Sequence, residues 1–123
     1  MSIEGASALA AAHWVPICKV DDIIAQGSRV VERKDAANIA VFKTISGRVF
    51  ALLDECPHKQ GPLSQGIVHG EQVTCPLHAW NIQLETGEAV TPDTGCTQHF
   101  AVHVQMVNGE AWVHLDATAL RNK

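Results

Sequence analysis

Two short boxes that each combine one cysteine with one histidine constrain this chain more than any other feature. The first is Cys56-Pro57-His58, and the second, sixteen residues later, is Cys75-Pro76-Leu77-His78. The proline after each cysteine fixes φ and removes an N–H donor, which favours a loop over the interior of a sheet. The sequence therefore predicts two loops that together offer two thiols and two imidazoles to bound metal.

This ligand set suits two metals better than one. Iron–sulfur clusters exist in which two histidines replace two cysteines on one of the two irons. With two thiolates and two neutral imidazoles the oxidised cluster is uncharged, so it accepts an electron more readily than a cluster with four thiolates. We expect Cys56 and Cys75 on one iron and His58 and His78 on the other. Because all four ligands would fill both irons, no catalytic residue is predicted in this chain.

A zinc site with two cysteines and two histidines is the alternative reading of the same boxes. Zinc fingers usually group cysteine with cysteine and histidine with histidine, and a helix carries the second pair. Here each box is mixed and lies between short strand-like segments. A zinc-stabilised binding module is therefore the less favoured hypothesis.

The periodicity along the chain is that of strands. Short runs rich in β-branched residues and bounded by turn residues predict strands. A short helical turn is expected at 21–24, and there is no long amphipathic helix. The fold class is predicted to be all-β, an antiparallel sandwich or barrel-like domain. The expected strands cover 13–20, 29–33, 38–43, 48–53, 66–69, 72–74 and 81–84.

The clearest local prediction is a hairpin near the C-terminal end. Asn108-Gly109 favours a type I′ turn, in which both central residues have positive φ. A two-residue loop there fixes the register and makes one face wholly apolar. The predicted pairs on that face are Met106 with Ala111, Val104 with Val113 and Val102 with Leu115.

Length and charge exclude several classes of protein. A chain of 123 residues fits one domain, and a formal charge of −4 with nine Lys and Arg gives no basic footprint for nucleic acid. Mild acidity favours a partner with a basic docking face. No apolar run approaches the roughly 18 residues of a membrane span. We therefore expect neither a nucleic-acid nor a membrane partner.

The N-terminal segment does not have the pattern of a signal peptide. The apolar stretch 8–12 is short, and Glu4 precedes it where a signal peptide carries Lys or Arg. We expect a disordered tail over 1–12, a domain over 13–118 and a C-terminal tail over 119–123, in the cytoplasm. Structural disulfides are not expected in that reducing compartment.

Residues outside the boxes give weaker predictions. Cys18 alternates with apolar neighbours and is predicted to be a buried or half-buried thiol, and Cys96 is expected to resemble it. Trp80 either shields the metal site or is an ordinary core aromatic. Four other histidines are predicted to lie at the surface: His69, His99, His103 and His114.

The boxes and their surroundings resemble the Rieske domain superfamily over roughly 14–115. The stretch CPHKQGPLSQGIVHGEQVTCPLHAWNIQLETGEA is similar, more narrowly, to the small subunit of NAD(P)H-dependent nitrite reductase. The segment 61–66 and the segment Asp93-Thr94-Gly95-Cys96 support this narrower resemblance. So does Ala79, since the Rieske ferredoxins of ring-hydroxylating oxygenases usually have glycine after the second histidine.

The resemblance also separates branches of the superfamily. Respiratory Rieske proteins have an extra cysteine in each box, and a disulfide between them braces the two loops. The equivalent positions here are Gly61 and Leu77, and the chain has no tyrosine to donate a phenolic hydrogen bond. The resemblance therefore implies the lower-potential, ferredoxin-like branch.

The resemblance implies a Rieske-type β-sandwich with two cluster-binding loops. One [2Fe–2S] cluster would be held by Cys56, His58, Cys75 and His78. The chain would be an electron-transfer or accessory subunit beside a large subunit that contains FAD, sirohaem and a [4Fe–4S] cluster. That large subunit would reduce nitrite to ammonium. The alternative is a free-standing Rieske ferredoxin that donates electrons to an oxygenase.

Overall fold

The computed structural model describes residues 14–33, 36–57, 61–77, 79–91 and 94–120. Within this part of the chain almost all regular structure is strand, and every strand pairing is antiparallel, which confirms the predicted all-β fold. The strands are β1 (Trp14–Lys19), β2 (Gly27–Arg33), β3 (Ala36–Lys43), β4 (Val49–Leu53), β5 (Ile67–His69), β6 (Gln72–Thr74), β7 (Asn81–Gln83), β8 (His99–Phe100), β9 (Val102–Val107) and β10 (Glu110–Asp116).

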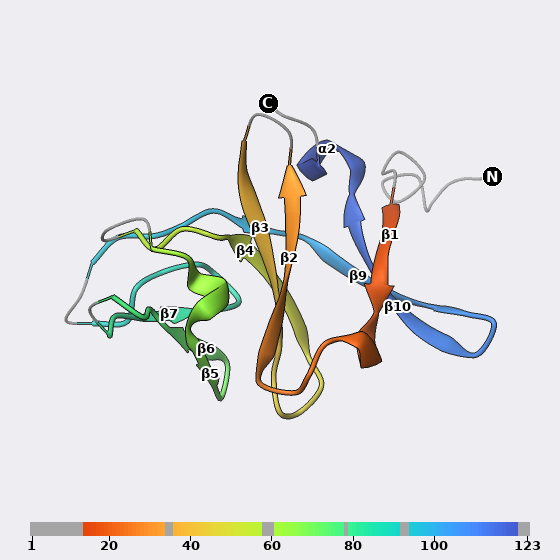
Figure 1. Ribbon diagram of the computed structural model, residues 1–123, viewed down its shortest axis with the longest axis horizontal. Coiled ribbons are helices and arrows are strands. Elements are labelled where there is room, and N and C mark those ends of the chain that lie inside the picture. The colour runs from red at the N-terminus through yellow and green to blue at the C-terminus, as the bar shows by residue number, and fades with distance from the viewer. Residues whose placement is uncertain (1–13, 34–35, 58–60, 78, 92–93, 121–123) are drawn as a thin grey trace.

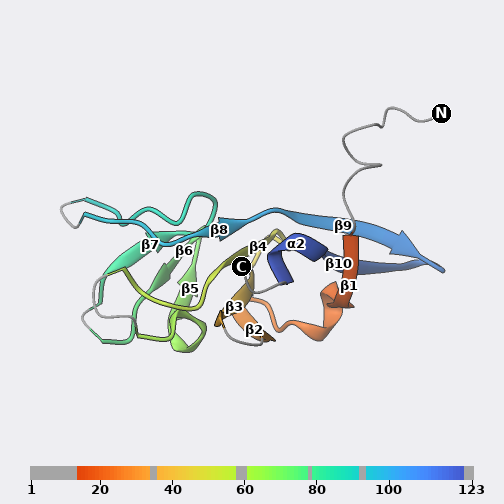
Figure 2. The ribbon, with the colours of Figure 1, turned by 90° about the horizontal axis from the view of Figure 1, so that it is seen from above.

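The strands form three sheets in a row. The first has the order β1-β10-β9, the second β2-β3-β4-β8 and the third β5-β6-β7. Figure 1 shows the third sheet at the left and the β9–β10 hairpin at the right, with the second sheet between them. The view from above in Figure 2 gives the same order. The hairpin and the third sheet therefore lie at opposite ends of the molecule.

The central strand β3 is buried on both faces. Ile39 and Val41 pack in a core with Ala51 of β4 and residues of β10, whereas Ala40 and Phe42 pack in a second core. Because successive strand residues point to opposite faces, two cores on either side bury a continuous apolar run. This explains why the sequence of β3 does not alternate between apolar and polar residues. The second core is the one that contains both box cysteines.

Helical structure is short. The helical turn predicted at 21–24 is the 3₁₀ helix η1 (Val20–Asp22), which ends earlier than expected because Ile23 is already extended. A second 3₁₀ helix, η2 (Leu63–Gln65), follows the first box. The helix α2 (Ala117–Leu120) and strand β8 were not predicted from the sequence. Strand β8 is two residues long and pairs with β4, so its formation depends on a distant partner. No helix in the described part of the chain is long and apolar enough to cross a membrane.

The C-terminal hairpin has the predicted register. Met106 pairs with Ala111, and Asn108 and Gly109 have φ of 52° and 83°, as a type I′ turn requires. Burial differs along the apolar face of the hairpin: Val113 is fully buried, whereas Met106 is 63% exposed. The outer half of the hairpin thus projects beyond the core.

Candidate metal centre

The two boxes form loops that are closed in the same way. In the first loop (residues 56–61) the Cys56 N–H donates to the Gly61 carbonyl at 2.8 Å. In the second loop (residues 75–80) the Cys75 N–H donates to the Trp80 carbonyl at 2.7 Å. Each cysteine therefore binds the carbonyl five residues later. The backbone makes the two boxes structurally equivalent, as their similar sequences indicate.

Both box cysteines have buried side chains. Cys56 is 0% exposed and Cys75 is 1% exposed, and they belong to one core with Leu63 and Leu84. Trp80 is partly buried and packs against this core. His58 and His78 lie outside the described residues, so the structure leaves the predicted placement of both imidazoles untested. It brings the two loops that carry the cysteines to one end of the molecule.

The first loop packs directly against the second box. A Cβ atom built on Gly61 would lie 2.6 Å from Leu77 Cδ1 and 3.7 Å from Cys75 Sγ. A side chain at position 61 would therefore displace Leu77. The resemblance drawn from the sequence placed Gly61 and Leu77 at the positions of a bracing disulfide, and here these two residues are in close contact. Packing joins the loops where the respiratory branch uses a covalent bond.

The donor set fits an iron–sulfur cluster. Thiolates are soft ligands that select iron–sulfur clusters and zinc, and two buried thiols on facing loops supply half of the predicted set. Cys75 also lines a hollow of about 450 Å³ bounded by parts of segments 65–67 and 74–79. Among the described residues no three His, Cys, Asp or Glu side chains gather as a metal site. This accords with two of the four predicted ligands lying outside that set.

A carboxylate links the segments before and after the first loop by hydrogen bonds. Asp54 accepts hydrogen bonds from the Ser64 N–H at 2.6 Å and from Ser64 Oγ at 2.8 Å. The Ser64 carbonyl in turn accepts from Ser28 Oγ of β2 at 2.7 Å. These bonds tie both ends of the first loop to the central sheet. Sequence reasoning missed Asp54 and Ser64, although an Asp two residues before the box was a local signal.

The segment that contains Cys96 lies against the first box. A Cβ on Gly95 would be 3.4 Å from the Cβ of Pro57, and the Gly95 carbonyl accepts from the Ala89 N–H at 2.9 Å. This brings 94–96 to the same end of the molecule as the two loops. Cys96 itself is exposed, so the expectation that it is buried like Cys18 was wrong.

Two other sequence predictions have clear outcomes. Cys18 is 3% exposed in the core remote from the boxes, and burial raises the pKa of its thiol. His114 was predicted at the surface but is only 6% exposed. Its ring lies edge-on to His103, whose ring centroid is 5.2 Å from that of Trp14. An aromatic cluster on the outer face of β10 thus covers a histidine that alternation alone assigned to solvent.

Ala79 is strained, which gives a testable consequence for the second loop. It has φ of 60°, in the left-handed region that glycine adopts without a Cβ penalty, and its side chain is exposed. We expect Ala79→Gly to raise the free energy of unfolding by about 0.5–1 kcal/mol, measured by urea denaturation. Ala111→Gly, in the regular strand β10, should lower it by a similar amount. A lower stability for Ala79→Gly would contradict this reading of the loop.

Comparison with known proteins identifies the relatives of this arrangement. Residues 13–101 match the model of the Rieske [2Fe-2S] domain. The chain is 30% identical over 101 residues to ferredoxin CarAc of Metapseudomonas resinovorans, covering 81% of this chain and 92% of that protein. It is also 33% identical over 72 residues to a 4beta-methylsterol monooxygenase of Methylococcus capsulatus. That match covers 58% of this chain but only 16% of the monooxygenase.

Solved structures agree on the fold. One is a ferredoxin in complex with the oxygenase of carbazole 1,9a-dioxygenase, with a TM-score of 0.69 and 30% identity over 80% of this chain and 99% of that one. Another is a proposed NADH-dependent nitrite reductase small subunit from Mycobacterium tuberculosis. Its TM-score is also 0.69, with 22% identity over 84% of this chain and 95% of that one. At that identity the second likeness concerns the fold alone.

Proposed function

We propose, from the premise that this chain belongs to the Rieske [2Fe-2S] domain family, that Cys56, His58, Cys75 and His78 are its cluster ligands. The family carries one Rieske-type [2Fe-2S] cluster, and the protein is an electron carrier of the ferredoxin type. The matched region contains both boxes, which supports these four ligands over a zinc site. The buried thiols of Cys56 and Cys75 at equivalent loop positions support the assignment further.

The cluster end of the molecule also has features of a docking surface. Leu77, inside the second box, is 51% exposed, and Ile67, across the same hollow, is 71% exposed. Both side chains line the hollow that Cys75 also lines, so together they form an apolar rim beside the box that a partner would cover. When bound, the cluster supplies one-electron transfer. The chain's own residues would hold it in place and present an apolar surface to the protein that exchanges the electron.

We propose that this partner is the large subunit of an NAD(P)H-dependent nitrite reductase, with FAD, sirohaem and a [4Fe–4S] cluster, in the cytoplasm. The single observation that carries the choice is the contact of Gly95 with Pro57. The segment around Gly95 resembles the nitrite reductase small subunit, and it lies against the first loop. The residues that resemble the nitrite reductase small subunit thus lie at the end of the molecule where a partner would receive the electron.

A second candidate is a free-standing ferredoxin that donates electrons to an oxygenase. The observation that favours it is the 30% identity to ferredoxin CarAc over 92% of that protein. The overall shape does not separate the two candidates, because representatives of both have a TM-score of 0.69 to this chain.

Reconstitution with purified partners tests the proposal. The holoprotein is mixed with the sirohaem large subunit and NADH or NADPH, and nitrite consumption and ammonium formation are followed. We expect co-purification of the two chains and faster nitrite reduction than with the large subunit alone. Electron transfer to a Rieske oxygenase, with no effect on nitrite reduction, would instead favour the second candidate.

Two substitutions at matched exposed positions test the docking surface. Leu77→Glu places a charge at the cluster end, whereas Met106→Glu places one on the hairpin at the opposite end, where Met106 is 63% exposed. We expect Leu77→Glu to weaken the effect on the partner about tenfold, as the loss of a central interface contact does. Met106→Glu should behave as wild type and keep the visible spectrum. Because Leu77 also packs against Gly61, the effect of Leu77→Glu on the partner is measured at equal cluster content. Equal effects of the two variants would contradict docking at the cluster end.

A further inference from the structure

The third sheet presents two different faces. Val68, Val73 and Ile82 are buried on its inner face, in the core that also contains the two box cysteines. The outer face contains polar side chains from all three strands. Those nearest the second loop are Thr74, immediately before Cys75, and Asn81, immediately after Trp80. The two residues are direct cross-strand partners in the β6–β7 pairing.

A chain of side-chain hydrogen bonds crosses this outer face. Thr74 Oγ1 lies 2.6 Å from Asn81 Oδ1, and His69 Nε2 lies 2.7 Å from Thr74 Oγ1 and 3.3 Å from Asn81 Oδ1. His69 pairs with Gln72 across the β5–β6 ladder, so Thr74 is its diagonal neighbour two residues further along β6, a distance that a long side chain can span. Three consecutive strands are thus linked at the base of the second loop.

The donors in this network can be assigned by counting protons. An amide oxygen only accepts, so Thr74 donates its one hydroxyl proton to Asn81 Oδ1. The contact between His69 and Thr74 must then be donated by the histidine, which requires a proton on Nε2. The network therefore runs in one direction, from His69 through Thr74 to Asn81. Each member depends on the one before it.

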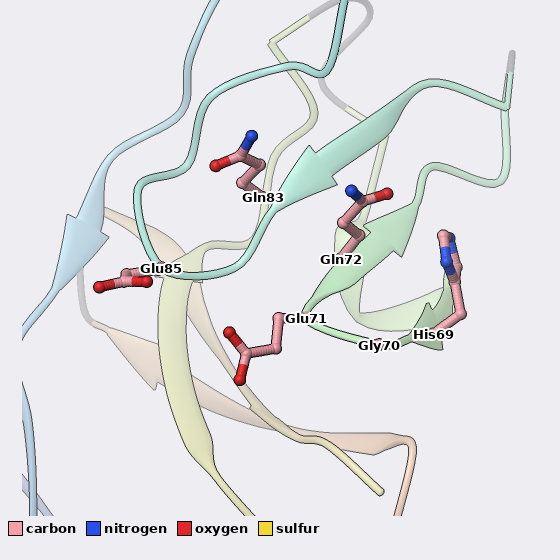
Figure 3. A pocket seen from close by; sticks show the side chains of 6 residues that line it. All are labelled: His69, Gly70, Glu71, Gln72, Gln83 and Glu85. Carbon is pink, nitrogen blue, oxygen red and sulfur yellow. The ribbon is translucent and has the colours of Figure 1, made fainter. Parts of the chain in front are cut away.

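The acidic residues near His69 do not take its imidazole away from Thr74. His69 lines a shallow hollow of about 310 Å³ together with Glu71, Glu85 and two glutamines. Figure 3 shows the side chains of Glu71 and Glu85 pointing in a different direction from the imidazole. Glu71 instead forms an ion pair with Arg48. The imidazole of His69 is hydrogen-bonded to Thr74 and lies within 3.3 Å of Asn81 Oδ1.

We propose that His69, Thr74 and Asn81 form a clamp that sets the geometry of the second loop, with His69 as a positioning residue. The clamp joins the residues on either side of the loop. These residues, Thr74 and Asn81, stand one position outside the hydrogen bond from the Cys75 N–H to the Trp80 carbonyl. The proposal rests on the assignment of Cys75 as a cluster ligand. Hydrogen bonds that orient metal-binding residues affect metal retention and electronic properties.

The first loop offers a parallel. There Asp54 accepts two hydrogen bonds from Ser64 and so joins the segments before and after that loop. Each loop therefore has a side-chain bond at its base in addition to its backbone closure. With Gly61 and Leu77 packed at the position of a bracing disulfide, polar clamps provide the constraint that a covalent link would give.

The test compares three threonine variants of the holoprotein. Thr74→Val keeps the shape but removes the hydroxyl, and Thr74→Ser restores it. Thr86→Val is the matched control, because Thr86 Oγ1 accepts a backbone N–H on an exposed turn away from the loops. Cluster release to a chelator is followed by the loss of visible absorbance well below the unfolding temperature. The EPR spectrum, the reduction potential and the unfolding midpoint are measured on the same samples.

We expect Thr74→Val to release the cluster about tenfold faster than wild type, since it loses two hydrogen bonds. Its EPR g-values and potential should shift, and Thr74→Ser should restore both. Thr86→Val should match wild type. A wild-type release rate and EPR spectrum for Thr74→Val would overturn the proposal. So would equal effects of Thr74→Val and Thr86→Val, which would reduce the clamp to a contribution to general stability.

A fourth variant keeps the test decisive if Thr74→Val does not fold. His69 is exposed on β5, so His69→Leu removes the first donor without disturbing the core. It should release the cluster roughly threefold faster, since it loses the short bond to Thr74 and the longer one to Asn81 but keeps the bond between Thr74 and Asn81. A release rate equal to wild type would exclude His69 as a positioning residue. No partner enters these measurements, so their failure is distinguishable from failure of the proposed function.

Discussion

Replacing Cys56 or Cys75 by serine is expected to yield a protein without its cluster. Serine replaces a soft thiolate ligand by a hydroxyl, and both positions are at most 1% exposed, so no surface side chain can take over the lost ligand's place. Ligand binding and folding are coupled in metal sites, and the unfolding midpoint should fall together with the loss of visible absorbance. Iron and sulfide analysis, visible spectroscopy and thermal unfolding of the purified variants check this result. His58→Ala and His78→Ala should behave in the same way.

The other two cysteines provide the controls for that experiment. Cys96 is exposed and Cys18 is buried in the core remote from the boxes. Cys96→Ser and Cys18→Ala should keep the full iron content, and Cys18→Ala should lose only the stability of a buried side chain. If Cys56→Ser or Cys75→Ser kept the wild-type spectrum, the residue concerned would leave the ligand set.

Replacing Gly87 by alanine is expected to destabilise the fold strongly. Gly87 has φ of 80°, and a Cβ there would lie 2.2 Å from the Thr97 carbonyl oxygen. Backbone atoms cannot rotate away as a side-chain tip can, and the Thr97 N–H is bonded to the Gly87 carbonyl. Left-handed strain and forced backbone movement together should lower the free energy of unfolding by about 2–5 kcal/mol. Urea denaturation measures this change.

Gly47 separates the two causes of that effect. It has φ of 94° but no heavy atom within 4 Å of a built Cβ, so Gly47→Ala adds strain without a clash. We expect it to cost about 1 kcal/mol. A loss for Gly87→Ala no greater than for Gly47→Ala would show that the segment ending at Thr97 moves freely.

The local parts of this fold could be predicted from the sequence. The hairpin register followed from Asn108-Gly109 because a two-residue turn admits one pairing that keeps apolar residues on a single face. The strands next to the second box followed in the same way from short alternating runs. Strand β8 and the burial of His114 could not be predicted, because each depends on partners far away in the chain.

The sequence by itself supplied two cysteines and two histidines in two similar boxes, and the family to which they point. Residue type and short spacing are sufficient for that, since a ligand set and a turn are local properties. Only the tertiary structure decided that Gly61 packs on Leu77 and that His69 reaches Thr74 across a strand. Such contacts depend on which sheet faces which core, and short-range patterns do not contain that information.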